Sequence, residues 1–161
     1  MKLSASMRSV KGLRVYADTS VFGGYFDPEF AKDSTNFFDE VKAGKFWLVT
    51  SDVLLFELRA APPRIMQILK SLSADSLSHI ELTEEMLTLR DAYLSAQVLP
   101  RNALNDAAHI AAATIGDVDL LVSWNFKHIV HYEKIRGFNA VNLLMGYHSI
   151  NIYSPKEVIS I

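Results

Sequence analysis

Residues 13–20 read LRVYADTS, and this stretch decides the fold. The run LRVYA at 13–17 is typical of a short β-strand, and it stops where the polar residues Asp18, Thr19 and Ser20 begin. In open parallel sheets, functional side chains gather just beyond the carboxyl ends of the strands. We therefore expect a strand over residues 13–17 that delivers Asp18 to such an edge.

Strand-like and helix-like segments alternate along the rest of the chain. Further strands are predicted over residues 46–50, 79–82, 119–123 and 150–153. Helices are predicted over residues 30–45, 103–115 and 133–144. A further helix is predicted from a cap at Ser51 or Asp52 to Pro62-Pro63, and another from Pro62-Pro63 to Ala74. The last is predicted from Thr83 to Leu99-Pro100. This order predicts a three-layer α/β fold with a central, mostly parallel sheet flanked by helices. We predict a flexible leader over residues 1–11 and a single domain over residues 12–161.

The composition excludes several classes of protein. The chain has 161 residues and no cysteine, which rules out disulfides, thiolate zinc sites and cysteine nucleophiles and favours the cytoplasm. No apolar run approaches the roughly 20 residues that span a bilayer, so no membrane association is expected. The formal net charge of −2 excludes a broadly basic nucleic-acid-binding surface. It still allows an enzyme that acts on nucleic acid through a local basic rim.

Three acidic residues stand out by their positions. Asp18 follows the first strand, while Glu57 and Asp106 lie on apolar helical segments. A buried, unpaired carboxylate costs several kcal/mol, so these acids need partners. Either each pairs with a neighbouring cation or backbone amide, or the three converge on a hard cation such as Mg²⁺, which prefers oxygen ligands. Asn125 follows the strand at 119–123 much as Asp18 follows the first, which favours convergence.

Four segments together resemble the motifs of PIN-domain nucleases, including the VapC-like toxin ribonucleases. They are YADTSVF at 16–22, LLFELRA at 54–60, NDAAHIAAAT at 105–114 and LVSWNFKHI at 121–129. The resemblance covers about residues 13–153. By motif position, Asp18, Glu57 and Asp106 match the three acidic metal ligands of the family, and Asn125 matches a fourth catalytic position that is often Asp. Thr19 or Ser20, together with Ser123, match the small hydroxyls that support the site.

The resemblance implies a PIN-like fold and a metal-dependent endoribonuclease that hydrolyses RNA phosphodiesters with Mg²⁺ or Mn²⁺. It further implies the toxin of a toxin–antitoxin pair, with a homodimer and a cognate antitoxin as partners. Arg59, Lys127 and His128 are candidates for contacts with substrate phosphates, against the alternative of a solvated surface. The neutral amide of Asn125 should attract a second metal ion less strongly than a carboxylate would.

Other interpretations stay open at this point. His109, three residues after Asp106, is either a packed core residue or part of the site, and Asp119 is either a solvated turn residue or a site residue. A phosphatase or receiver fold would need a further acid close to Asp18, where the chain has Thr19 and Ser20. A non-catalytic PIN-like module that binds RNA or a protein partner is the main alternative. The presence of all three acids favours catalysis.

Overall fold

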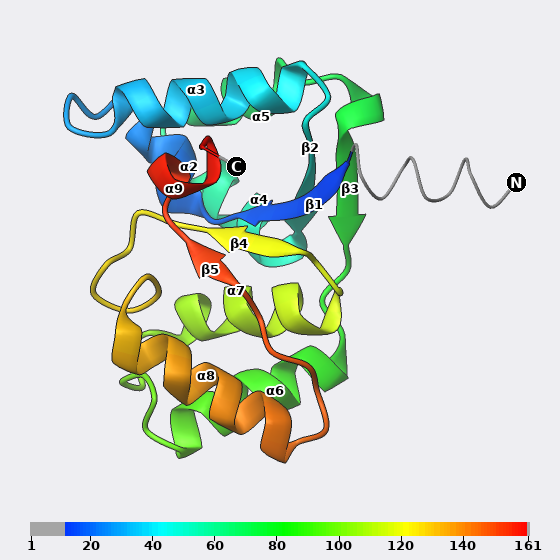
Figure 1. Ribbon diagram of the computed structural model, residues 1–161, viewed down its shortest axis with the longest axis vertical. Helices are drawn as coiled ribbons and strands as arrows, with labels where there is room; N and C mark the ends of the chain where they lie inside the picture. Colours follow the sequence, from blue (N-terminus) through cyan, green and yellow to red (C-terminus); the bar gives the residue numbers. More distant parts are fainter. Residues whose placement is uncertain (1–11, 161) are drawn as a thin grey trace, which may run out of the picture.

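The computed structural model describes residues 12–160 and is built on a central five-stranded sheet (Figure 1). The strands are β1 (Leu13–Ala17), β2 (Phe46–Ser51), β3 (Leu77–Ile80), β4 (Leu120–Val122) and β5 (Ile152–Tyr153). Their order across the sheet is β3-β2-β1-β4-β5, and every pairing is parallel. The predicted α/β fold with a parallel central sheet is therefore confirmed.

Helices cover both faces of this sheet (Figure 1). They are α2 (Thr19–Gly24), α3 (Ala31–Lys42), α4 (Asp52–Ala60), α5 (Pro63–Lys70), α6 (Glu84–Ser95), α7 (Leu104–Ile115), α8 (Tyr132–Leu144) and α9 (Pro155–Val158), with a 3₁₀ turn over Ala74–Ser76. Within residues 12–160, no helix is both long and apolar enough to cross a membrane. The leader predicted over residues 1–11 lies outside the described residues.

Two apolar clusters, one on each face, explain the three layers. Alternate residues of a strand point to opposite faces of a sheet. Tyr16 of β1 accordingly packs with residues of α6, α7 and α8, whereas Val15 and Ala17 pack with residues of α2, α3, α4 and α5. Helix α7 is apolar almost all round and is buried along most of its length, as the sequence predicts.

Several boundaries differ from the sequence prediction. The helix expected to run to Ala74 ends at Lys70, and the one expected to run to Leu99 ends at Ser95. In the second case the backbone turns at Gln97, whose φ of 59° is left-handed and incompatible with a continuing helix. Helix α2, which Asp18 caps by accepting from the backbone N–H of Ser20, was not expected, because its six residues are too short a pattern to recognise.

Asp52 joins the start of α4 to the segment that leaves β3. Its carboxylate accepts a hydrogen bond from the backbone N–H of Leu82 at 2.8 Å and lies 2.8 Å from Nε2 of His79. These contacts hold the pKa of Asp52 below its ordinary value, the Leu82 N–H having the largest effect. Because the folded state favours the ionised carboxylate, this contribution to stability is present above the unfolded pKa of about 3.9 and is lost as pH falls through the lower folded pKa.

We expect Asp52→Asn to lower the free energy of unfolding at pH 7, because one amide oxygen replaces two charged acceptors. The difference from the wild type should shrink as pH falls below about 4, where the carboxyl is protonated first in the unfolded chain and then, at lower pH, in the folded protein. Urea unfolding at pH 7 and pH 3 measures this, with the exposed Asp39→Asn as control. A difference that does not change with pH would show that the charge of Asp52 is unimportant.

Candidate acidic site at the carboxyl edge of the sheet

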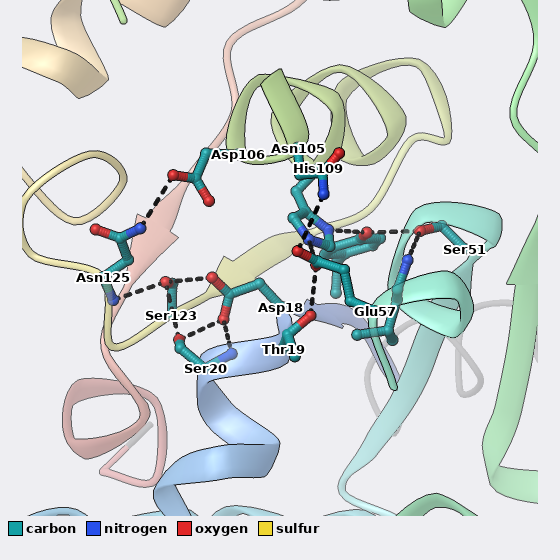
Figure 2. Close-up of polar contacts among 12 residues, drawn as sticks. Asp18, Thr19, Ser20, Ser51, Glu57, Asn105, Asp106, His109, Ser123 and Asn125 are labelled. Atoms are coloured by element: carbon teal, nitrogen blue, oxygen red, sulfur yellow. Dashed lines mark hydrogen bonds and ion pairs between the residues drawn. The ribbon is translucent and has the colours of Figure 1, made fainter. Parts of the chain in front are cut away.

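The carboxyl ends of β1, β2 and β4 deliver polar residues to one edge of the sheet. Asp18 directly follows β1, Ser123 directly follows β4, and Glu57 lies on α4, which begins where β2 ends. Helix α7 brings Asp106 in its first turn to the same region (Figure 2). The backbone N–H of Asp18 donates to the carbonyl of Val122 at 3.2 Å, so the chain segments after β1 and β4 stay in register.

Asp18 is buried and fully hydrogen-bonded. Its Oδ1 accepts from the backbone N–H of Ser20 at 3.1 Å and from the Ser20 hydroxyl at 2.5 Å, and its Oδ2 accepts from the Ser123 hydroxyl at 2.7 Å. Burial raises the pKa of Asp18 above its ordinary value, although nearby His109 and these hydroxyls favour the carboxylate. Ser20 and Ser123 therefore fix both oxygens of an acid that is costly to ionise.

Glu57 is half-buried and held mainly through one oxygen. Oε1 accepts from the Thr19 hydroxyl at 2.6 Å and lies 2.5 Å from Nε2 of His109. Oε2 has only a long contact of 3.4 Å, from the side-chain amide of Asn105. Burial acts to raise the pKa of Glu57, but the hydrogen bonds from His109 and Thr19 outweigh it, so that the pKa lies below its ordinary value. Glu57 is thus an ionised group with one oxygen nearly free.

Asp106 faces the loop that follows β4. Its Oδ2 accepts from the side-chain amide of Asn125 at 3.2 Å and lies 3.0 Å from Nδ1 of His128. The carbonyl oxygen of the Asn125 side chain accepts from the backbone N–H of His128 at 2.9 Å, which closes the turn. Among the described residues, Oδ1 of Asp106 has no hydrogen-bond partner. Asn125 therefore orients Asp106 and shapes its own loop at once.

Trp124 anchors this loop to the other side of the sheet. Its ring stacks on Phe30 with centroids 4.3 Å apart, its indole N–H donates to the Ser34 hydroxyl at 2.9 Å, and its backbone N–H donates to the Ser20 hydroxyl at 2.8 Å. Gly24 permits the approach, because a Cβ there would lie 2.7 Å from Nε1 of Trp124. These contacts determine where Ser123 and Asn125 sit.

Sequence reasoning missed three residues that contact the acids or their partners. Asn105 reaches Glu57, while Tyr16 and Ser51 lie behind His109, with the Tyr16 hydroxyl 2.5 Å from Nδ1 of His109 and 2.6 Å from Oγ of Ser51. The signal for Tyr16 was available, since a tyrosine in a wholly buried strand must find a partner for its hydroxyl. His109 itself is both a packed core residue and a neighbour of Glu57.

The remaining candidates lie in different surroundings. Arg59 and Lys127 are exposed and, within residues 12–160, make no hydrogen bond or ion pair with the three acids. His128 contacts Asp106 and is not a free surface cation. Asp119 precedes β4 and so lies at the opposite edge of the sheet, where its carboxylate accepts from the backbone N–H of Arg14 at 2.8 Å.

The donor set suits a hard cation in its chemistry but is not gathered around one point. Carboxylate and amide oxygens are the ligands that Mg²⁺ prefers. Glu57 and Asp106 each keep one oxygen with little or no hydrogen bonding to the described residues. However, each acid is paired with its own neighbours, and no three acidic, histidine or cysteine side chains of residues 12–160 form a group that could hold a metal ion. A cation bound at this edge would use the oxygens that Glu57 and Asp106 keep open, Oε2 and Oδ1 respectively.

Comparison with known proteins identifies the fold. Neither a protein-family model nor a curated protein matches the sequence. Among solved structures, the chain matches one from the structure of FitAB bound to the IR36 DNA fragment, with a TM-score of 0.55 and 14% identity. The match covers 88% of this chain and 94% of that one. Together with the parallel sheet flanked by helices, it supports the fold expected from the motifs. The fold is PIN-like.

The burial of Asp18 generates a prediction about stability. Its folded pKa is raised, so the protein loses stability as pH rises through the unfolded pKa of about 3.9 toward the folded one. Asp18→Asn removes this cost, and Asn also caps helices well. In EDTA at pH 7, we expect the variant to have a higher melting temperature than the wild type, by about 2–4 °C for each kcal/mol of stability gained. The difference in melting temperature between the two proteins should be smaller at pH 4.

Differential scanning calorimetry at the two pH values measures this effect, with Asp39→Asn as an exposed control. An Asp18→Asn variant that is less stable than the wild type at pH 7 would contradict the prediction. It would show that the hydrogen bonds from Ser20 and Ser123 outweigh the cost of burying the charge.

Proposed function

We propose that this protein is a metal-dependent endoribonuclease that hydrolyses RNA phosphodiesters and acts as the toxin of a toxin–antitoxin pair in the cytoplasm. The observation that carries the proposal is the arrangement of Asp18, Glu57, Asp106 and Asn125 at one edge of a PIN-like sheet. The four motifs that resemble PIN-domain nucleases contain these same four residues. A purely structural set of acids would not need to share one edge.

In this proposal, Asp18, Glu57 and Asp106 hold Mg²⁺ or Mn²⁺. Such an ion polarises a phosphate oxygen and lowers the pKa of bound water. Ser20 and Ser123 hold Asp18 in place, Thr19 does the same for Glu57, and Asn125 does so for Asp106. The exposed cations Arg59 and Lys127 are proposed to contact RNA phosphates, while His128 acts through Asp106.

The proposal that this protein is a toxin also implies binding partners. The structurally similar FitAB chain belongs to a structure that contains a bound DNA fragment, and this likeness supports a partner for the present chain. We propose a cognate antitoxin as that partner, a homodimer as the assembled form, and residues 12–161 as the domain that follows a leader. Co-expression with a neighbouring small open reading frame and size-exclusion chromatography with light scattering test these points.

A non-catalytic PIN-like module is the second candidate, and one observation favours it. Each acid is already paired with neighbouring hydroxyl, amide or imidazole groups, and no three-residue metal group is formed within residues 12–160. Such a module would bind RNA or a protein without cleaving it. The two candidates therefore differ in whether bound RNA is cut when a divalent cation is added.

The first test is cleavage of single-stranded RNA by the purified chain with Mg²⁺, with Mn²⁺ and with EDTA. We expect cleavage only with metal, and a loss of more than about 100-fold in Asp18→Asn and Asp106→Asn, equivalent to about 2.7 kcal/mol of barrier. Asp39→Asn should stay active because Asp39 is exposed on α3. RNA that binds but is not cut under any of these conditions would favour the non-catalytic module.

A second test concerns Asn125, where the chain departs from the acid common in the family. Asn125→Ala should reduce cleavage less than Asp18→Ala, because only the latter removes a charged ligand. Asn125→Asp places a second carboxylate against Asp106, so it should lower both the melting temperature in EDTA and the Mg²⁺ concentration for half-maximal cleavage. An Asn125→Ala enzyme as inactive as Asp18→Ala would show that the amide acts directly in the reaction.

A further inference from the structure

A buried chain of hydrogen bonds runs from the start of α4 to Glu57. Oγ of Ser51 lies 2.6 Å from the Tyr16 hydroxyl, which lies 2.5 Å from Nδ1 of His109, whose Nε2 lies 2.5 Å from Oε1 of Glu57. Figure 2 shows Ser51, His109 and Glu57 at this edge of the sheet. Tyr16, Ser51 and His109 are all buried. The Tyr16 and His109 rings also meet edge to face, with centroids 5.6 Å apart. The hydroxyls of Ser20, Ser123 and Thr19 hold Asp18 and Glu57 without the help of these buried hydrogen bonds.

The direction of the chain follows from its hydrogen-bond partners. Ser51 accepts from the backbone N–H of Leu54 as the cap of α4, which leaves its own proton for the Tyr16 oxygen. Tyr16 can then donate to Nδ1 of His109, so that Nε2 carries the proton that faces Glu57. This arrangement gives every donor an acceptor, and it ends on a negatively charged oxygen, where a hydrogen bond is strongest.

The same chain links the three segments that carry the acids. Tyr16 lies two residues before Asp18 on β1, and His109 lies three residues after Asp106 on α7. Ser51 is the last residue of β2 and caps α4, the helix that carries Glu57. The orientation of the Glu57 carboxylate is therefore set by the strand that positions Asp18 and by the helix that positions Asp106.

We propose that His109 and Tyr16 are positioning residues that fix Glu57 for cation binding. The inference rests on the proposed function, since it assigns Glu57 a cation to bind. Carboxylate and histidine ligands are commonly oriented by a further layer of hydrogen bonds, and loss of such a partner typically costs about 10–100-fold in metal affinity or activity. Oε1 is held by His109 and Thr19, which leaves Oε2 with only the long contact from the side-chain amide of Asn105.

A second buried tyrosine provides a matched control. Tyr93 is fully buried in the same apolar cluster, and its hydroxyl donates to Oδ1 of Asn142 at 2.5 Å. Neither residue contacts an acid of the site. Tyr93→Phe and Tyr16→Phe each delete one buried, hydrogen-bonded hydroxyl and keep the ring, so both should lower the melting temperature. Only Tyr16→Phe breaks the chain to Glu57.

The experiment measures Mn²⁺ binding to the full chain without RNA, by isothermal titration calorimetry. We expect Tyr16→Phe to weaken Mn²⁺ binding about 10-fold and Tyr93→Phe to leave it unchanged. His109→Leu should weaken binding about 10–100-fold, whereas His109→Gln, whose amide can still donate to Glu57, should restore most of it. In cleavage assays, Tyr16→Phe should raise the Mg²⁺ concentration for half-maximal rate and leave the rate at saturating Mg²⁺ close to that of the wild type.

Two results would overturn the inference while the proposed function stands. One is a wild type that binds Mn²⁺ no more tightly than Tyr16→Phe. The other is a Tyr16→Phe enzyme with a lower rate at saturating Mg²⁺ and an unchanged half-maximal Mg²⁺ concentration, which would indicate a purely structural role. A wild type that neither binds Mn²⁺ nor cleaves RNA would instead reject the proposed function, and the inference with it.

Discussion

The parallel pairing of β1 with β2 on one side and β4 on the other is the constraint on which the rest of the structure depends. Because all three strands run the same way, the residues that follow them arrive at one edge. The hydrogen bond from the Asp18 N–H to the Val122 carbonyl continues the β1–β4 ladder past its last pair, Ala17 with Val122. Ser123 is thereby brought within 2.7 Å of Asp18, and no loop has to be ordered separately to form this contact.

Bringing acids together at such an edge is electrostatically unfavourable. Each acid is accordingly surrounded by hydrogen-bond donors. Asp18 is deep enough for burial to raise its pKa, whereas Glu57, nearer to solvent and bound to His109, has a lowered one. Two carboxylates at the same edge of the sheet thus sit in environments that push their pKa values in opposite directions. Replacing a buried charged group by a well-packed hydrophobic one is often neutral or stabilising, so stability alone does not call for a carboxylate at the position of Asp18. The cost is explained if the acids serve another purpose.

The sequence predicted the parts of the fold that depend on local periodicity. The strand at Leu13–Ala17 and the apolar helix that ends at Ile115 appear where expected, because runs of apolar residues and their caps are local signals. The strand expected over residues 79–82 instead spans Leu77–Ile80, because no local pattern indicates where pairing with β2 begins. Helix α2 was missed because a six-residue helix offers too short a pattern to recognise.

The candidate site was foreseeable in its acids but not in the groups that hold them. Asp18, Glu57 and Asp106 stood out because a carboxylate after a buried strand or on an apolar helix is unusual by itself. The partners of Glu57 come from α2 and α7, so their selection depends on tertiary packing that no local pattern encodes. His109 illustrates the difficulty: on an alanine-rich helix it has the surroundings of a core residue, yet its Nδ1 meets the Tyr16 hydroxyl while its Nε2 reaches Glu57. Packing and site chemistry are therefore properties of the same ring, so burial alone could not decide between the two interpretations of this histidine.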